Sequence, residues 1–386
     1  MKLCVVVPSF YPAFIYGGPI VSIHNTCRAL ADLGVEIFVS TTNANGVGKL
    51  DVPVNQFQRL AENYYVKYYD DTIVGRFSWQ FSFNIAEDIR ACDVVKVEDI
   101  FSTYVPITLF FSMLYKKKVM LSVRGVLSKW ALKSQKKILK QLWLFFFIRP
   151  FRNNIVWHAT SLDEKDDITG TFAGANVVVV PNGVSVEDYR KLPILSRSQY
   201  LSLFGISLSD DTQVIVSMGR LHKVKGFPIL IEAFAMLHNE NSKIALLIAG
   251  DDDGVGEELS LMIHRLGMTD AVFLLGNISG DKKAQFLAGA DIFALTSHSE
   301  NFGNVYLEAL ASGTPILATE GTPWHDIRRF GCGVSTDYCP GNIRNALRDM
   351  LAGDLNKMRE SAFSYADNFT WNSIAADLQV ELEAIQ

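Results

Sequence analysis

The sequence predicts an α/β protein with two doubly wound domains, and three observations lead to this prediction. Short apolar runs rich in β-branched residues alternate with longer amphipathic stretches, a pattern typical of parallel strands joined by helices. At 386 residues the chain is longer than a single hydrophobic core usually serves. The alternation is interrupted over residues 184–211, where proline and serine intervene. We therefore expect two parallel sheets that face each other across a cleft, with the carboxyl ends of their strands at the cleft.

The expected strands are short and apolar. In the first domain they cover residues 3–7, 36–40, 94–97, 119–123, 155–159 and 177–180. In the second domain they cover residues 214–217, 244–249, 272–275, 292–295 and 315–318. The interruption sets the domain limits, so we expect a first domain over 1–190 and a second over 191–369. A C-terminal helix over about 370–386 is expected to pack back on the first domain.

The composition is that of a soluble globular protein, and the scattered cysteines fit a reducing cytoplasm. Apolar residues make up 49% of the chain and charged residues 20%, and the net charge of -5 argues against general nucleic-acid binding. The five cysteines are scattered without a Cys-x-x-Cys pair, so we predict neither a zinc site nor a disulfide framework. No apolar run reaches about 18 residues, and the apolar start, residues 3–7, is too short for a signal peptide.

Two glutamates eight positions apart, Glu300 and Glu308, are the most informative feature of the chain. They bracket a glycine turn at Gly303, between an apolar strand and the start of a helix. Free backbone N–H groups at such a helix N-terminus favour anions, above all phosphate. A carboxylate that faced a phosphate would repel it, so we expect each glutamate to meet hydroxyls of a sugar or ribose. The alternative is a solvated pair on an ordinary surface helix.

A basic turn flanked by glycines follows the first strand of the second domain. It covers residues 219–226 and contains Arg220 and Lys225, just before a helix that starts near Phe227. A forked guanidinium and a compact ammonium together suit a diphosphate. The alternative is a basic loop that caps a neighbouring helix C-terminus.

A third glycine turn, Gly17-Gly18-Pro19, follows the first strand of the first domain. Its glycines would let the backbone approach a phosphate or sugar closely, and proline is favoured in the first turn of a helix. Such a sequence also occurs in plain turns, so by itself it indicates little.

Together these elements resemble the retaining glycosyltransferases of family 4 (glycosyl transferases group 1), which have the GT-B architecture of two Rossmann-like domains. The resemblance covers nearly the whole chain in the right order. Its specific part is the pair Glu300 and Glu308 with Phe302-Gly303 between them. The other matching elements are Gly17-Gly18, Pro181-Asn182-Gly183-Val184, Gly219-Arg220, Lys225-Gly226 and Ala311-Ser312-Gly313-Thr314-Pro315-Ile316.

The resemblance implies roles for single residues. Arg220 and Lys225 would bind the donor diphosphate, Glu300 the donor sugar, and Glu308 the ribose hydroxyls. Backbone amides of residues 302–305 would cover the phosphate and sugar, and the loop after the third strand of the second domain lies where the family reads the nucleobase. The predicted donor-binding residues are Gly17, Gly18, Arg220, Lys225, Asn277, Ile278, Phe302, Gly303, Asn304, Val305 and Glu308, and the predicted catalytic residues are Glu300 and Arg124.

The chain departs from the family pattern in the first domain. Where some relatives carry a histidine near the reacting sugar, this chain has Arg124, which cannot act as a base but can stabilise a departing phosphate. Lys96, Glu98 and Asp99 likewise follow a strand where relatives often show histidines. His158 ends a strand, and we expect it to be structural rather than catalytic.

The run Asp251-Asp252-Asp253 resembles the metal-binding Asp-x-Asp of the other glycosyltransferase fold. Because it follows a strand in a chain of GT-B type, we interpret it as a solvated loop. We predict that neither a metal nor any other cofactor takes part, and that a nucleoside diphosphate-sugar is the donor substrate.

An anionic membrane surface is a further candidate partner. No acidic residue occurs from Ile100 to Leu162, and this stretch contains the apolar run 142–148. A basic face beside Trp and Phe is typical of an interfacial helix, which would place the protein on the inner face of the cell membrane. A buried helix with solvated lysines is the alternative, and both stay open. The basic residues are Lys116, Lys117, Lys118, Arg124, Lys129, Lys133, Lys136, Lys137, Lys140, Arg149 and Arg152.

The function that we predict is transfer of a sugar, with retention of the anomeric configuration, from a UDP- or GDP-sugar to a glycan or lipid-linked acceptor. The expected setting is cell-surface polysaccharide biosynthesis, with no role for nucleic acid. Two alternatives stay open: a sugar-nucleotide epimerase or phosphorylase of similar fold, and a catalytically inactive sugar-nucleotide-binding protein, which the missing histidines suggest. A dinucleotide dehydrogenase is not supported, because Gly250, Gly254 and Gly256 miss the fingerprint spacing.

Overall fold

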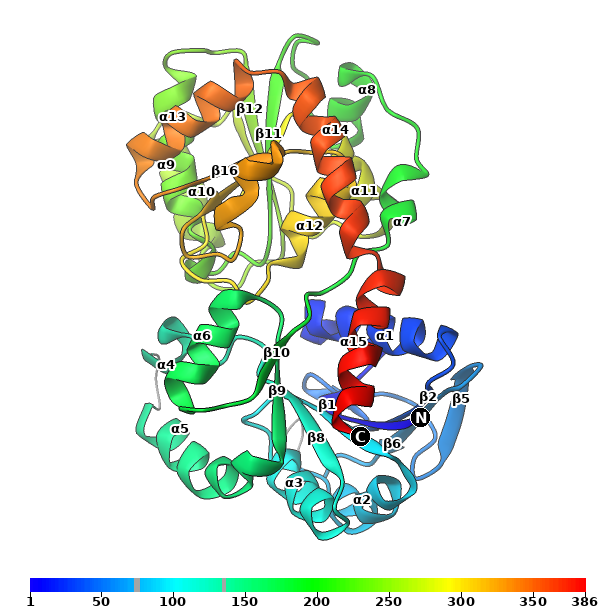
Figure 1. The fold of residues 1–386 in the computed structure, drawn as a ribbon. Helices are drawn as coiled ribbons and strands as arrows, with labels where there is room; N and C mark the ends of the chain where they lie inside the picture. The colour runs from blue at the N-terminus through cyan, green and yellow to red at the C-terminus, as the bar shows by residue number, and fades with distance from the viewer. Residues whose placement is uncertain (73–76, 134–136) are drawn as a thin grey trace. The chain divides into compact units, whose positions relative to one another are not determined.

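The computed structural model describes residues 1–72, 77–133 and 137–386, and it divides into two compact units (Figure 1). The N-terminal unit comprises Met1–Gly183 and Trp371–Gln386, and the C-terminal unit comprises Val184–Thr370. The first dividing point therefore lies between residues 183 and 184, earlier in the chain than the boundary expected after residue 190. Within the described ranges, no helix is both long and apolar enough to cross a membrane.

The N-terminal unit is built on an eight-stranded sheet with the order β10-β9-β8-β7-β1-β2-β6-β5. Its strands pair in parallel, except that the edge strand β5 is antiparallel to β6. The strands are β1 (Lys2–Ser9), β2 (Glu36–Thr42), β5 (Phe57–Ala61), β6 (Tyr64–Tyr69), β7 (Val94–Glu98), β8 (Lys118–Ser122), β9 (Ile155–Ala159) and β10 (Val177–Val179), and a hairpin pairs β3 (Ala44–Asn45) with β4 (Gly48–Lys49).

The sequence prediction misses β5 and β6. Strand β5 lies at the sheet edge and is largely exposed, so it has no continuous apolar run. Strand β6 carries Lys67 in its middle, which breaks the apolar pattern. That lysine is nevertheless buried, because its Nζ lies 3.0 Å from Oδ1 of Asp88 on a helix that covers the sheet.

Helices cover both faces of this sheet (Figure 1). On one face α2 (Trp79–Ala91) packs against α3 (Tyr104–Leu114), and on the other α1 (Gly18–Asp32) packs against α15 (Trp371–Ile385). The C-terminal helix thus completes the N-terminal unit. The remaining helical segments of this unit are a 3-10 turn (Phe14–Tyr16), α4 (Lys129–Lys133), α5 (Lys137–Trp143), a π-helical turn (Leu144–Ile148), a 3-10 turn (Arg149–Asn154) and α6 (Leu162–Thr171).

The C-terminal unit is built on a six-stranded parallel sheet with the order β13-β12-β11-β14-β15-β16. Its strands are β11 (Gln213–Met218), β12 (Ile244–Ala249), β13 (Val272–Leu274), β14 (Ile292–Ala294), β15 (Ile316–Thr319) and β16 (Gly333–Thr336). The edge strand β16 was not expected from the sequence, because it is short and mostly half-buried. Strands β11, β12 and β14 are wholly or almost wholly buried, which accounts for their continuous apolar sequences.

Helices also flank both faces of the second sheet (Figure 1). Helices α9, α10 and α13 lie on one face, and α7, α11, α12 and α14 lie on the other. Their bounds are α7 (Val186–Arg190), α9 (Phe227–His238), α10 (Gly256–Arg265), α11 (Gly280–Ala288), α12 (Asn304–Ala311), α13 (Pro340–Leu351) and α14 (Leu355–Ala366). The other helical segments are α8 (Arg197–Leu203) and 3-10 turns at Lys223–Lys225, His325–Phe330 and Asp367–Phe369.

Gly226, just before α9, joins two loops of this unit. Its φ of +67° is left-handed, and a Cβ at this position would lie 2.0 Å from the carbonyl oxygen of Thr296. Thr296 belongs to the loop after β14, and its Oγ1 donates a hydrogen bond to the Gly226 carbonyl at 2.8 Å. The loops that follow β11 and β14 are therefore in direct contact with each other.

Candidate functional site

In the C-terminal unit the candidate site lies where the order of the strands reverses. The chain runs from β11 through β12 to β13 and then returns to the other side of β11 to form β14. At such a point the connections that leave the two neighbouring strands run in opposite directions and open a crevice at the carboxyl ends. The two connections here are residues 219–226, after β11, and residues 295–303, after β14. They contain four of the eleven predicted donor-binding residues, Arg220, Lys225, Phe302 and Gly303, together with the predicted catalytic Glu300.

Lys225 and Glu300 join these two connections. Nζ of Lys225 lies 2.6 Å from Oε1 of Glu300, and the two side chains are only 17% and 11% exposed. The hydroxyl of Ser297 donates a hydrogen bond of 2.7 Å to the same carboxylate oxygen. Because both charges are partly removed from water, each holds the other in place. The pair keeps an ammonium and a carboxylate side by side at the crevice.

Arg220 does not take part in this pair. Its side chain is 72% exposed, and its NH1 lies 2.8 Å from Oδ2 of Asp253. The structure therefore separates the two cations that the sequence placed on one diphosphate. An exposed ion pair is weak, so the Arg220 guanidinium can leave Asp253 for a ligand at little cost in free energy.

The start of α12 adds backbone donors to the crevice. Gly303 is the N-cap, with a left-handed φ of +77°, and it has no side chain to cap the first turn. Backbone N–H groups of that turn are therefore presented at the carboxyl edge of the sheet. The preceding Phe302 is buried against Trp324, whose Nε1 donates a hydrogen bond of 2.7 Å to the Phe302 carbonyl. The Phe302 ring is thus held in the core and Gly303 has no side chain, so these two residues can offer only main chain to a ligand.

Glu308 lies on α12 and is held by two partners. Its Oε2 is 2.7 Å from Nζ of Lys283 on α11. Burial, followed by the charge of Glu308 and a hydrogen bond to it, raises the pKa of the Tyr189 hydroxyl. Asn277 and Ile278 follow β13 at the same edge of the sheet, where the Ile278 side chain is buried in the core and Asn277 is exposed.

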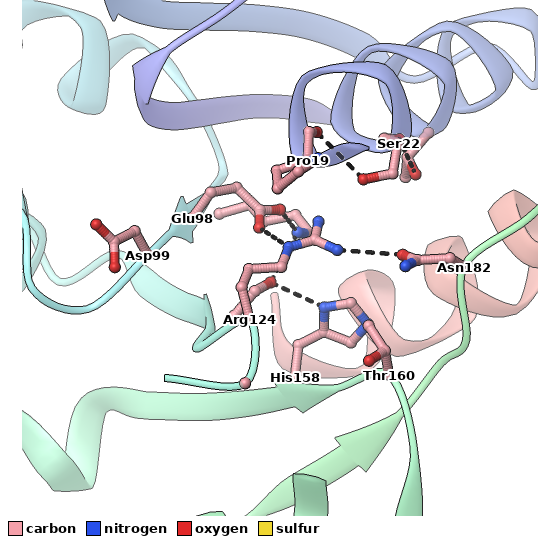
Figure 2. Close-up of polar contacts among 12 residues, drawn as sticks. Pro19, Ser22, Glu98, Asp99, Arg124, His158, Thr160 and Asn182 are labelled. Carbon is pink, nitrogen blue, oxygen red and sulfur yellow. Dashed lines mark hydrogen bonds and ion pairs between the residues drawn. The ribbon is translucent and has the colours of Figure 1, made fainter. Parts of the chain in front are cut away.

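The N-terminal unit has a polar cluster at its own switch point (Figure 2). Strand β1 is flanked by β2 on one side and by β7 on the other, so the connections after β1 and β7 run apart. Gly17 is the N-cap of α1, which follows β1, and Glu98 ends β7. Figure 2 shows Glu98 and Asn182 each joined to the guanidinium of Arg124 by a dashed line.

Glu98 and Arg124 form the centre of this cluster. Oε2 of Glu98 accepts a hydrogen bond of 2.8 Å from Nε of Arg124, and Oε1 pairs with the ammonium of Lys96. NH1 of Arg124 donates to Oδ1 of Asn182 at 3.1 Å. Lys96 and Glu98 are two positions apart on β7 and therefore point to the same face of the sheet. Burial alone would raise the pKa of Glu98, but Arg124 and Lys96 outweigh it and lower that pKa to about 2.

His158, on β9, is held through both ring nitrogens. Nδ1 lies 2.8 Å from the Ser122 hydroxyl, and Nε2 lies 2.9 Å from the carbonyl oxygen of Val180. Since a carbonyl only accepts, Nε2 carries the proton and Nδ1 accepts from Ser122. Burial, together with the charges of Lys96 and Arg124, lowers the pKa of His158 to about 3. This geometry agrees with the structural role that the sequence suggested.

The neutral His158 should make the protein less stable in mild acid. Below pH 6.5 an unfolded histidine takes up a proton, whereas folded His158, with a pKa of about 3, does not, so protonation favours the unfolded state. We expect this group to lower the free energy of unfolding as the pH falls from 6.5 to 4.5, with a slope that approaches about 1.4 kcal/mol per pH unit. Urea titrations across this range measure the slope.

The matched variants for this measurement are His158→Gln and His325→Gln. Glutamine at position 158 can form hydrogen bonds but does not titrate, so its slope should be shallower, whereas replacing the exposed His325 should leave the parent slope. A parental slope in His158→Gln would contradict a buried neutral imidazole.

Asp252 has a local structural role. Its Oδ1 accepts hydrogen bonds from the amides of Gly254, Val255 and Gly256 at 3.0, 3.0 and 2.8 Å, which fixes the start of α10. In the parts of the chain that the structure describes, no group of three His, Cys, Asp or Glu residues is arranged to hold a metal ion. That no metal takes part stays a prediction.

Several residues at these sites were not assigned a role from the sequence. They are Ser297, Lys283 and Tyr189, which contact the two glutamates, and Asn182, which contacts Arg124 and had been noted only as part of a matching motif. All but Ser297 come from parts of the chain distant in sequence from the residues they hold, so no local pattern points to them.

Comparison with known proteins covers both units. The family model described as Glycosyltransferase Family 4 matches residues 16–188, and the model described as Glycosyl transferases group 1 matches residues 203–366. The D-inositol 3-phosphate glycosyltransferase of Actinosynnema mirum is 34% identical over 237 residues, which cover 56% of this chain and 54% of that protein. The alpha-monoglucosyldiacylglycerol synthase of Streptococcus pneumoniae is 30% identical over 146 residues, 38% of this chain and 33% of that protein. The chain thus spans about half the length, or less, of these curated relatives.

Among solved structures, HepE of Anabaena in complex with UDP and glucose is similar over 100% of both chains, with a TM-score of 0.74 and 19% identity. This likeness confirms the GT-B fold of two Rossmann-like domains that the sequence predicted. The two family models lie one after the other along the chain, in the order of its two sheets. The chain belongs to the family 4 glycosyltransferases.

Proposed function

We propose that this protein is a retaining glycosyltransferase that moves a sugar from a nucleoside diphosphate-sugar to a glycan or lipid-linked acceptor. The observation that carries the proposal is the Lys225–Glu300 pair beside the N-terminus of α12, at the strand-order reversal of the C-terminal sheet. A cation and backbone N–H groups stabilise a leaving diphosphate, and a carboxylate binds sugar hydroxyls. Cell-surface polysaccharide biosynthesis is the proposed setting.

In the C-terminal unit we assign the roles that the family resemblance implies, and this geometry supports them. The Lys225 ammonium and the amides of residues 302–305 bind the diphosphate, and the exposed Arg220 turns to it from Asp253. Glu300 contacts the donor sugar, and Glu308 exchanges part of its contact with Lys283 for ribose hydroxyls. These groups neutralise the leaving diphosphate without a metal. UDP is the first donor nucleotide to test, because it is bound in the similar structure of HepE.

In the N-terminal unit, Arg124 is the second proposed catalytic residue. The bond between the anomeric carbon and the diphosphate breaks, the acceptor oxygen takes its place, and the acceptor proton leaves to the diphosphate or to water. A fixed guanidinium stabilises negative charge that develops on an oxygen during this exchange. It cannot accept the proton itself.

A thermal-shift screen of the full chain against UDP-, GDP- and ADP-sugars tests donor binding, because a ligand that binds only the folded state raises the unfolding temperature. Transfer by the selected donor is then followed by NMR of the product anomer, which should keep the donor configuration. Turnover without an acceptor, or with inorganic phosphate, would instead indicate an epimerase or phosphorylase. Binding without any product would indicate an inactive binding protein, and no binding at all would contradict the proposal.

The segment after α4 supports an acceptor at a membrane surface. Along α5 and the π-helical turn, apolar side chains at helical spacing form one outward face, with exposed fractions from 48% for Leu142 to 74% for Ile138. Leu144 and Ile148 are buried on the opposite side. Of the basic residues in this region, Lys136 and the side chains of Lys129 and Lys133 lie outside the described residues. The other members of the outward face are Leu139, Phe145 and Phe146.

An exposed apolar face in a segment without acidic residues suits anionic lipid, because the charges attract the headgroups and the aromatic rings enter the interface. One of the relatives, the alpha-monoglucosyldiacylglycerol synthase, is named for a lipid product. We therefore include the inner face of the cell membrane among the proposed partners.

The expected result is that the protein sediments with phosphatidylglycerol vesicles at low salt and is released in part as salt rises, because salt screens the attraction. Phe145→Ser/Phe146→Ser should lose most of this binding. Val380→Ser is the matched control, since Val380 is similarly exposed but lies on α15. Equal absence of binding to anionic and neutral vesicles at low salt would contradict membrane association, and unchanged binding of the double variant would contradict the assigned face.

A further inference from the structure

We infer that Glu98 is a positioning residue that fixes the guanidinium of Arg124 at the carboxyl edge of the N-terminal sheet (Figure 2). The inference rests on the proposed function, because Arg124 is the residue taken to meet the reacting oxygens. It goes further in assigning a task to Glu98 and Asn182, which contact Arg124, and to Lys96, which contacts Glu98.

The contacts fix both the position and the plane of the guanidinium. Nε is bonded to Glu98 at 2.8 Å and NH1 to Asn182 at 3.1 Å, so two of its three nitrogens are tied to different elements. Within the described residues, NH2 has no hydrogen bond. The Arg124 side chain is 14% exposed, against 2% for Glu98. Arg124 is therefore the more exposed of the two side chains, and one nitrogen of its guanidinium is left for a ligand.

Arg124 also has an unusual backbone conformation. Its φ of +54° is in the left-handed region, which residues with side chains seldom adopt. A side chain from another part of the unit holds this turn, because the Gly125 amide donates a hydrogen bond of 2.6 Å to Oε1 of the buried Glu164. Asp99, after β7, is left-handed as well, with a φ of +77°, and its amide bonds to the Ser122 carbonyl at 3.1 Å. Strain of this kind often accompanies functional sites, although Asn63 and Lys116 show it in other turns of this chain.

Lys96 helps to keep the Glu98 carboxylate ionised and oriented. Its ammonium pairs with Oε1 of Glu98 and donates a 3.0 Å hydrogen bond to the Ser122 hydroxyl, which in turn contacts His158. One carboxylate oxygen is thus directed to Lys96 and the other to Arg124. With its pKa lowered to about 2, Glu98 stays ionised at every pH at which the protein would work. The carboxylate can therefore orient Arg124 without taking part in proton transfer.

A second buried ion pair in the same unit serves as a structural comparison. Lys67 Nζ lies 3.0 Å from Oδ1 of Asp88, whose Oδ2 accepts hydrogen bonds from Tyr69 and Ser40. Removing either carboxylate leaves a buried cation without its partner, so both changes should lower stability. Only the change at Glu98 should affect how Arg124 is held.

Nitrogen-15 NMR of the arginine side chains tests the positioning independently of activity. In the parent, the Arg124 Nε–H signal, identified by its loss in Arg124→Lys, should exchange slowly with solvent. In Glu98→Gln that protection should be lost, whereas in Asp88→Asn it should remain. If the Arg124 signal is unprotected in the parent, or equally protected in Glu98→Gln, the inference is wrong whatever the activity. Glu98→Asp, which keeps the charge, replaces Glu98→Gln should the latter fail to fold.

Kinetics then tests whether positioning matters for transfer, using the donor selected by the thermal-shift screen, with UDP-glucose as the default probe. Glu98→Gln should lower kcat about 100-fold, the size expected when a reacting group is misplaced by about 1 Å, with little change in the donor KM. Asp88→Asn should keep the parental kcat. In the background of Arg124→Ala, adding Glu98→Gln should have no further effect on kcat, because Glu98 acts through Arg124.

Chemical rescue gives the sharpest contrast. Guanidinium ion at millimolar concentration should restore part of the activity of Arg124→Ala, but not of the double variant Arg124→Ala/Glu98→Gln, which lacks the carboxylate that binds it. Additive losses in the double variant, or equal rescue of both, would overturn the inference. If the parent itself transfers no sugar while its Arg124 signal is protected, the proposed function fails and the positioning by Glu98 stands.

Discussion

Replacing Glu300 with glutamine is expected to lower sugar transfer by on the order of 100-fold while leaving nucleoside diphosphate binding intact or slightly stronger. In the proposed role Glu300 contacts the donor sugar, so its charge should matter mainly as the sugar leaves the donor. In the free protein its Oε1 is 2.6 Å from Lys225 Nζ and competes with the diphosphate for that cation. Removing the carboxylate charge frees the ammonium for the ligand. Calorimetric titration with nucleoside diphosphate and a steady-state transfer assay measure the two effects.

Glu320→Gln is the matched control for this experiment. It makes the same chemical change at an exposed position just after β15, and it should keep both nucleotide affinity and transfer. Full transfer by Glu300→Gln would show that this carboxylate does not act on the sugar. A large loss of nucleotide affinity in the same variant would place Glu300 at the nucleotide rather than at the sugar.

Replacing Lys225 with alanine is expected to weaken nucleoside diphosphate binding by about 1.5–3 kcal/mol, the range for hydrogen bonds to charged groups. This corresponds to a loss of about 10- to 150-fold in affinity. The Lys225 side chain is only 17% exposed, so alanine removes a charge that is held at the proposed diphosphate site. Arg220→Ala should weaken binding in the same range if the exposed guanidinium turns from Asp253 to the ligand.

Lys223→Ala provides the comparison for general charge effects. Lys223 lies in the same 3-10 turn but is exposed. Its replacement therefore changes the net charge without removing the cation at the proposed diphosphate site. We expect its titration curve to match that of the parent. Unchanged affinity in both Lys225→Ala and Arg220→Ala would remove the basis for a diphosphate site in this loop.

The sequence predicts the buried parallel strands because burial on both faces demands continuous apolar runs, as in β12. It also locates the turn before α12, because Gly303 interrupts the pattern where the chain must take a left-handed conformation. Edge strands such as β5 and β16 are not predicted in this way, because a strand that is partly exposed to solvent does not need a continuous apolar run. Strand β6 is missed because Lys67 interrupts its apolar run. The charge of Lys67 is neutralised by Asp88, which is distant in the sequence.

Side-chain partners are harder to predict than elements. Arg220 and Lys225 belong to one short loop, yet one pairs with Asp253 after β12 and the other with Glu300 after β14. Their directions depend on which strands flank β11, and that order is a property of the whole sheet. The partners of Arg124 are hard to predict for the same reason, because Glu98 and Asn182 reach it from the ends of different strands.

Hydrogen exchange of the full chain, with and without the nucleoside diphosphate chosen by the thermal-shift screen, tests the central assignment most directly. A ligand that bonds to backbone amides slows their exchange. We expect slower exchange in residues 219–226 and 302–308, the two segments that meet beside Lys225 and Glu300. Binding that leaves both segments unchanged and protects another part of the chain would contradict the assignment of the donor site.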